Sequence, residues 1–130
     1  MKKSKFQFLN PYLVKLNFAV NSEFISEDDP NIKIENSFSI NVDRKEDEKK
    51  ASVILTLNVN KENAKAPFMI EISVASDFKW ADDVEDDAAD KMLHVNAPAL
   101  LLGYMRPIVA NITNSAGYPA YNVPFISFTE

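Results

Sequence analysis

The stretch ASVILTLNV, residues 51–59, decides the fold class, because every second residue in it is apolar. The apolar positions are Ala51, Val53, Leu55, Leu57 and Val59. A period of two is typical of a β-strand with one buried face and one solvated face. The stretch FMIEISV, residues 68–74, has the same period, with polar residues on its other face. The two stretches therefore predict two strands of one sheet.

Two further strands are predicted toward the N-terminus. Between residues 6 and 20 the even positions are apolar except for Asn10, and they are Phe6, Phe8, Tyr12, Val14, Leu16, Phe18 and Val20. Pro11 cannot donate to a strand ladder, so it predicts an edge strand or a break at that point. Residues 32–42 alternate in the same way, with Asn36 as the exception. Four such strands predict an antiparallel sheet that is covered on one face.

A helix is predicted over about residues 98–114. Asn96 suits its N-cap, Pro98 suits its first turn, and Gly117 supplies a terminator. Its apolar arc is wide, so we expect it to be covered on more than one side. The acidic run over residues 82–90 lacks the residue order and the glycine of a calcium loop. We therefore predict that this run is a solvated loop leading into the helix.

One helix is too small to cover the predicted sheet. Strands of about ten residues are about 33 Å long, and four of them span about 19 Å. A helix of about 17 residues is about 25 Å long and about 10 Å wide. The rest of the apolar face must meet another subunit, the aromatic segment over residues 117–130, or a bound client.

The composition narrows the class of protein. The chain has 130 residues, enough for a single domain, and it has no cysteine and a net charge of −5. It has no basic patch for nucleic acid, and no apolar run that suits a signal peptide or a membrane span. His94 is the only histidine, and no nucleophile or metal-ligand motif accompanies it. We predict a cytoplasmic protein that is not an enzyme and needs no cofactor or metal.

Three segments resemble the SecB family of protein-export chaperones. They are PFMIEI at residues 67–72, leading to Phe78; APALLLGYMR at residues 97–106; and GYPAYNV at residues 117–123, followed by Phe128. The second is similar to the family's Cys-Pro-x-x-Leu-Phe-Pro-Tyr-x-Arg, which Pro98, Leu101, Tyr104 and Arg106 match. The chain has Ala97 in place of the cysteine and Gly103 in place of the second proline. The resemblance covers about half of the chain.

The resemblance implies an α+β fold, with a four-stranded antiparallel sheet and one long helix packed on one face. It implies one SecB-like chaperone domain over residues 1–130, assembled into a homotetramer or at least a dimer. The implied activity is ATP-independent holding of unfolded polypeptide, for preprotein export or for a dedicated partner such as an antitoxin. The implied partners are unfolded clients and the Sec translocase motor or an antitoxin, without nucleic acid or membrane insertion.

Aromatic residues outside the periodic segments are candidates for client binding, because they bury large apolar areas without demanding a sequence. The candidates are Phe78, Trp80, Tyr104, Tyr118, Tyr121, Phe125 and Phe128. The alternative is that they close the core. The candidate oligomer interface is the helix stripe of Leu101, Met105, Ile108 and Ile112. Two other classes remain open, a binder of small apolar ligands and an assembly protein that uses the same sheet face.

Overall fold

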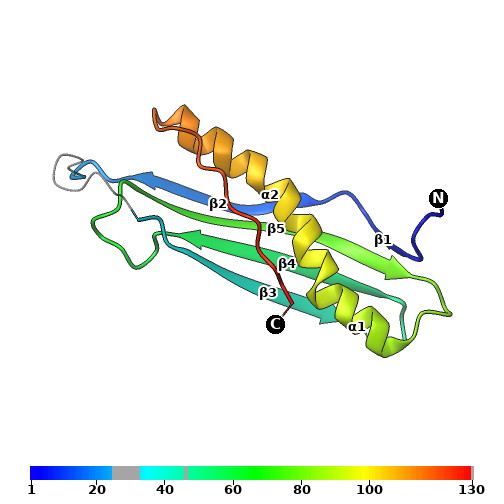
Figure 1. Cartoon of the computed structure of the whole chain (residues 1–130). Helices are drawn as coiled ribbons and strands as arrows, with labels where there is room; N and C mark the ends of the chain where they lie inside the picture. The colour runs from blue at the N-terminus through cyan, green and yellow to red at the C-terminus, as the bar shows by residue number, and fades with distance from the viewer. Residues whose placement is uncertain (25–32, 46, 130) are drawn as a thin grey trace.

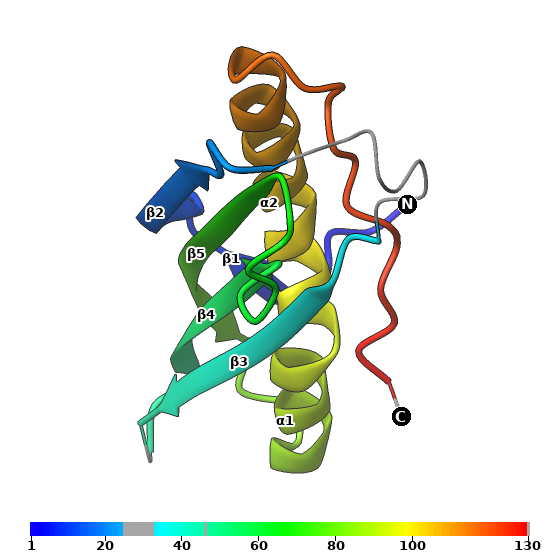
Figure 2. The same ribbon diagram turned by 90° about the vertical axis from the view of Figure 1, so that its left-hand side faces the viewer.

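One antiparallel sheet with helices on a single face forms the framework (Figures 1 and 2). The computed structural model describes residues 1–24, 33–45 and 47–129. The strands are β1 (Phe6–Phe8), β2 (Tyr12–Val20), β3 (Asn36–Arg44), β4 (Lys50–Val59) and β5 (Phe68–Trp80). The helices are α1 (Asp86–His94) and α2 (Asn96–Ser115). The predicted α+β class, with an antiparallel sheet and one long helix, is confirmed.

β5 is the central strand. It pairs with β4 along one side, and β4 pairs with β3, which forms one edge. Along its other side β5 pairs first with β1 and then with β2. The single strand expected over residues 6–20 is therefore two strands, separated at the position where Pro11 predicted a break. Over the residues that the structure describes, the sheet has five strands but is four strands wide.

A β-bulge at Val14 changes the face on which the residues of β2 lie. Leu13 lies opposite Val74, and Lys15 lies opposite Ser73, so Val14 is an extra residue in the ladder. Paired residues lie on the same face of a sheet. Leu13 therefore shares the helix-covered face with Val74, and the prediction that Tyr12 lies on that face is wrong. After the bulge, the even positions return to the covered face.

The core lies between the sheet and α2. On β4 and β5 it contains Val53, Leu55, Leu57, Val59, Ile70, Ile72 and Val74, and on α2 it contains Leu101, Leu102, Met105 and Val109; their exposed fractions are at most 4%. The alternation of residues 51–59 and 68–74 therefore marks the buried face correctly. Burial at this scale contributes about 1.5–3 kcal/mol for each large aliphatic side chain.

The sequence predicted that the acidic run over residues 82–90 is a loop, but the structure shows that its second half is helical. Asp86 begins α1, whose first turn is acidic and therefore favourable to the helix dipole. Ala89 and Leu93 are the buried residues of this helix. α2 follows directly, because Val95 separates the two helices and its carbonyl accepts from the Ala99 N–H at 3.3 Å. Asn96 is thus the first residue of α2 and not its cap. Residues 25–32, which include Ile32 and most of the polar connection expected before it, lie outside the described residues.

The buried position of Leu101 leads to a stability prediction. We expect Leu101→Ala to lower the free energy of unfolding by about 2–5 kcal/mol, because the side chain is fully buried and its loss leaves a cavity. Urea unfolding followed by circular dichroism measures this change. The control Met69→Ala, at a side chain that is 40% exposed, should change it by about 0.5 kcal/mol or less. Equal effects at the two positions would contradict the packing described here.

Candidate binding surfaces

An exposed apolar strip follows the free edge of β1 and β2. We define this edge strip as Phe8, Leu9, Tyr12, Leu13 and Val14, together with Tyr104 of α2; their exposed fractions are between 37% and 57%. Phe8 and Tyr104 join the strand to the helix, with ring centroids 6.3 Å apart. Among the described residues β2 pairs only with β5, so its other backbone edge is open. The strip combines apolar surface with unpaired backbone groups.

Phe78 and Trp80, two of the predicted client-binding residues, are core residues. Their exposed fractions are 2% and 5%. Phe6 stacks on both, with centroid distances of 5.4 Å and 6.0 Å, and the guanidinium of Arg44 lies 5.1 Å from the Trp80 ring. Side chains covered in this way have almost no surface to offer a client, so this part of the prediction is corrected.

The segment over residues 117–129, which we call the tail, lies beside α2 on the β3 side of the sheet (Figures 1 and 2). Tyr118 packs on Phe68 and donates its hydroxyl to the Pro67 carbonyl at 3.1 Å. The hydroxyl of Tyr121 accepts from Asn36 Nδ2 at 2.6 Å. These two aromatic residues are half-buried, as is Phe128. The tail therefore covers part of the sheet face that α2 leaves open, one of the three possibilities that the sequence allowed.

Phe125 differs from the other aromatic residues of the tail. It is 89% exposed, and its ring lies 4.8 Å from the guanidinium carbon of Arg106. Arg106 also donates from Nε to the Val123 carbonyl at 2.8 Å. Of the seven residues predicted to bind clients, only Tyr104 and Phe125 are exposed, and they belong to different surfaces.

The helix stripe predicted as an oligomer interface divides in two. Leu101 and Met105 have no exposed surface within one chain, because they pack on its own sheet. They cannot contact a second subunit in this conformation, so this part of the prediction is corrected. Ile108 and Ile112 are half-buried, and their role at an interface stays a prediction.

The sheet face opposite α2 carries polar pairs. Lys15 Nζ lies 2.9 Å from Glu71 Oε1, and Asn17 Nδ2 donates to the same oxygen at 3.2 Å. The hydrogen bond from Lys15 holds the pKa of the Glu71 carboxyl below its usual range. Ser52 Oγ donates to Asp77 at 2.5 Å on the same face. These pairs make this face polar, in contrast to the exposed Phe8, Leu13 and Tyr104 of the edge strip.

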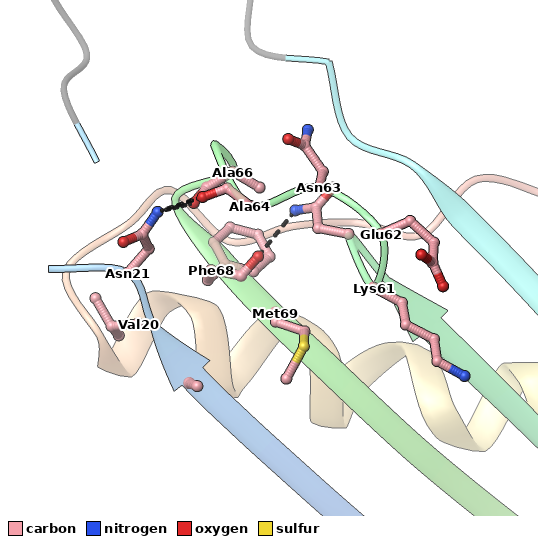
Figure 3. A pocket seen from close by; sticks show the side chains of 11 residues that line it. Val20, Asn21, Lys61, Glu62, Asn63, Ala64, Ala66, Phe68 and Met69 are labelled. Atoms are coloured by element: carbon pink, nitrogen blue, oxygen red, sulfur yellow. Dashed lines mark hydrogen bonds between the residues drawn. The ribbon is translucent and has the colours of Figure 1, made fainter. Parts of the chain in front are cut away.

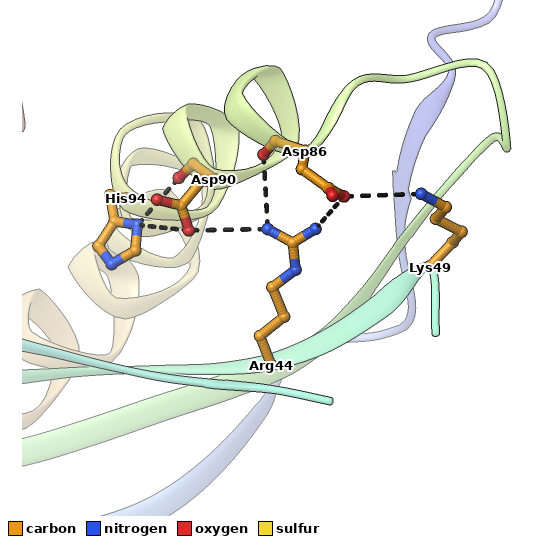
Figure 4. A network of polar contacts seen from close by, with 5 residues as sticks. All are labelled: Arg44, Lys49, Asp86, Asp90 and His94. Atoms are coloured by element: carbon orange, nitrogen blue, oxygen red, sulfur yellow. Dashed lines mark hydrogen bonds and ion pairs between the residues drawn. The ribbon is translucent and has the colours of Figure 1, made fainter. Parts of the chain in front are cut away.

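A network of ionic contacts joins the β3–β4 hairpin to α1 (Figure 4). Arg44 contacts Asp86 at 2.7 Å and Asp90 at 3.8 Å, and Lys49 lies 3.6 Å from Asp86. His94 Nδ1 donates to the Asp90 carbonyl at 2.9 Å. His94 therefore caps a helical turn on the surface. Among the described residues no group of three or more potential metal ligands comes together, and no helix is long and apolar enough to cross a membrane.

A shallow cavity of about 370 Å³ lies where β2 ends beside the β4–β5 loop (Figure 3). Asn60 adopts a φ of 59° there, donates to the Phe68 carbonyl at 3.0 Å and accepts from the Glu35 N–H at 3.0 Å. Asn21 donates to the carbonyls of Ala64 and Ala66 at 3.1 Å and 2.9 Å. These amides hold the loop in place and are already paired, so they do not converge on a ligand.

Comparisons with known proteins identify the family. The family model described as "Preprotein translocase subunit SecB" matches residues 1–130. The chain therefore belongs to the SecB family. It is similar to the protein-export protein SecB of Dinoroseobacter shibae, with 29% identity over 117 residues, 86% of this chain and 65% of that protein. It is also similar to that of Anaplasma phagocytophilum, with 31% identity over 80 residues, 59% of this chain and 51% of that protein. The chain thus spans about half to two thirds of the length of these relatives.

Two solved structures resemble the fold. One is a SecB-like chaperone of Mycobacterium tuberculosis in complex with a peptide from the antitoxin HigA1, with 15% identity, a TM-score of 0.72, and coverage of 95% of this chain and 88% of that chain. The other is a protein of unknown function from Streptococcus agalactiae, with 13% identity, a TM-score of 0.51, and coverage of 95% and 100%. At these identities the likeness shows the fold alone.

The Lys15–Glu71 contact can be tested by titration. We expect Lys15→Met to raise the pKa of Glu71, because the largest contribution that lowers it is lost. A lowered folded-state pKa stabilises the fold above the unfolded-state pKa, and this contribution is lost as the pH falls through the folded-state pKa. The stability of the variant should therefore depend less on pH in the acid range. Carbon-13 NMR of the Glu71 carboxyl measures the shift, and Lys50→Met, which removes a partner of Glu48, is the control.

Proposed function

We propose that the protein is a holdase chaperone that binds unfolded polypeptide without ATP and without catalysing a reaction. Membership of the SecB family over all 130 residues is the observation that carries this proposal. The exposed apolar residues of the edge strip and Phe125 support it, because contiguous apolar surface is typical of sites that bind other chains. Apolar contacts combined with strand-like backbone pairing bind many sequences and require no cofactor.

The two exposed surfaces suit two different roles. The edge strip lies on an open strand edge, so a second copy of the chain can pair there and bury both strips at once. We assign this surface to homo-oligomerisation, with Tyr104 as an interface residue. Half-buried Ile108 and Ile112 are proposed to contact further subunits. The tail side of α2, with Phe125 exposed on it, is assigned to unfolded clients.

Two cellular roles fit a holdase of this family. The relatives at 29% and 31% identity are named protein-export proteins, which supports preprotein export in the cytoplasm with the Sec translocase motor as a partner. The structural neighbour holds an antitoxin peptide, which supports a dedicated partner instead. Purification of the protein from its own cells, with identification of the bound chains, separates the two. Clients with signal peptides indicate export, and one small partner indicates the dedicated role.

The holdase activity predicts that the protein slows aggregation. We expect near-stoichiometric amounts to suppress light scattering by a chemically unfolded protein that is diluted into buffer without ATP or metal. Addition of ATP should change nothing. An inert protein of similar charge at the same concentration is the control. Scattering equal to that of the control would contradict the proposal, and tight binding of a small apolar molecule would favour the alternative class.

Assembly through the edge strip predicts a change of mass. We expect Leu13→Lys to shift the oligomer toward the monomer mass of 14.7 kDa, because a charge at a half-exposed edge position opposes strand pairing. Light scattering after size exclusion measures the mass. The control Ser39→Lys places the same charge at an exposed position of the opposite edge strand. An unchanged mass for Leu13→Lys would exclude this surface as the interface.

A further inference from the structure

The tail is held in place almost like a separate peptide. Beyond Tyr118, its backbone makes no hydrogen bond to the backbone of any other described residue. Three contacts with side chains fix it instead. The Tyr121 N–H donates to Thr113 Oγ1 at 2.9 Å, Arg106 donates to the Val123 carbonyl at 2.8 Å, and Asn36 donates to the Tyr121 hydroxyl at 2.6 Å. An integral strand has its backbone groups paired in a ladder, whereas most of the tail backbone has no such pairing.

The side chains of the tail also resemble those of a bound extended segment. Val123 is fully buried, and Ile126 and Phe128 pack half-buried against the core. Phe128 meets Phe38 of β3 edge-on, with centroids 6.0 Å apart. The residues between these positions are exposed. The surface beneath the tail therefore accepts apolar side chains from an extended chain and leaves the other side chains of that chain in water.

This surface contains polar groups that recognise a main chain and not a sequence. Arg106 and Thr113 offer a donor and an acceptor that any peptide carbonyl and N–H can use. Asn36 Oδ1 is buried and has no hydrogen-bond partner among the residues described. The tail thus leaves one buried acceptor unused. An acceptor of this kind favours a ligand that supplies a donor.

We infer that the tail occupies the client surface itself, and that an extended apolar segment of the client displaces it. This inference rests on the proposed holdase function and adds where the client binds. When the tail leaves, the client backbone takes its place and makes the same contacts with Arg106 and Thr113. The tail is part of the same chain, so it competes with the client at a high effective concentration. Chains with weakly apolar segments are therefore excluded. The observed affinity equals the intrinsic affinity multiplied by the fraction of molecules in which the tail is displaced.

A reversible cross-link tests this directly. The chain has no cysteine, so Arg106→Cys combined with Phe125→Cys creates the only two thiols, at positions whose side chains are in contact. A short disulfide-containing bis-maleimide locks the tail on α2, and a reductant releases it. The probe is reduced, carboxymethylated α-lactalbumin, a permanently unfolded protein, and the measurement is fluorescence anisotropy. We expect affinity at least about tenfold weaker in the locked form, with full recovery after reduction.

A second variant tests the displacement of the tail without a cross-link. Tyr121→Phe removes the hydrogen bond from Asn36 to the tail and leaves Arg106 and Thr113 for the client, so we expect about fivefold tighter binding of the same probe. Arg44→Ala removes an ionic contact from the distant network with Asp86 and should not tighten binding. Equal affinity of the locked and reduced forms would overturn the inference while the proposed function stands. Absence of binding by the wild-type chain would overturn both.

Discussion

The pairing of β5 along both of its sides is the constraint on which the other elements depend. β5 has 13 residues and is about 43 Å long, longer than any of its partners. Its length gives room for β1 and β2 to lie end to end on one side while β4 follows the other. Its covered face provides the platform for α2. A change that shifted β5 by one residue would turn Ile70, Ile72 and Val74 away from the helix together.

α2 divides the covered face of the sheet into two unlike parts. On the side of β3, the tail completes the apolar layer and leaves Phe125 in water. On the side of β2, no described segment of the chain covers the layer, and Phe8, Leu13 and Tyr104 remain exposed. The proposed roles assign the open surface to a second copy of the chain, and the surface beneath the tail to a client that competes with the tail. The two proposed roles follow from this asymmetry.

Much of the fold was predictable because alternation over residues 51–59 and 68–74 depends only on which face is buried. The same parity continues to Phe78 and Trp80, and following it further would have placed both in the core. The bulge at Val14 was not predictable, because an extra residue in a ladder leaves no mark on an apolar sequence. The start of α1 was missed because six acids in the run suggested a solvated loop, whereas buried Ala89 and Leu93 determine the helix.

The sequence predicted that apolar binding surfaces exist but not where they lie. An excess of apolar surface over one helix follows from dimensions alone, but its position depends on the path of the tail. Tyr118, Tyr121 and Phe128 have the composition of a binding surface, and only their contacts with Pro67, Asn36 and Phe38 distinguish packing from exposure. The helix stripe was also predictable only as an apolar surface. A period near four shows which residues share a face of the helix, but not whether that face packs on the chain's own sheet or on another chain.

The bulge at Val14 has a consequence for polymerisation. A sheet with two similar open edges can add copies without limit, which is how fibrils grow. Here one edge is apolar and locally twisted by the bulge, whereas β3 carries Ser37, Ser39, Asn41 and Asp43 on its outer face. Unlike edges of this kind oppose head-to-tail stacking and favour a closed two-fold pair. A chain with the proposed holdase function would thereby avoid serving as a template for fibrils of its clients.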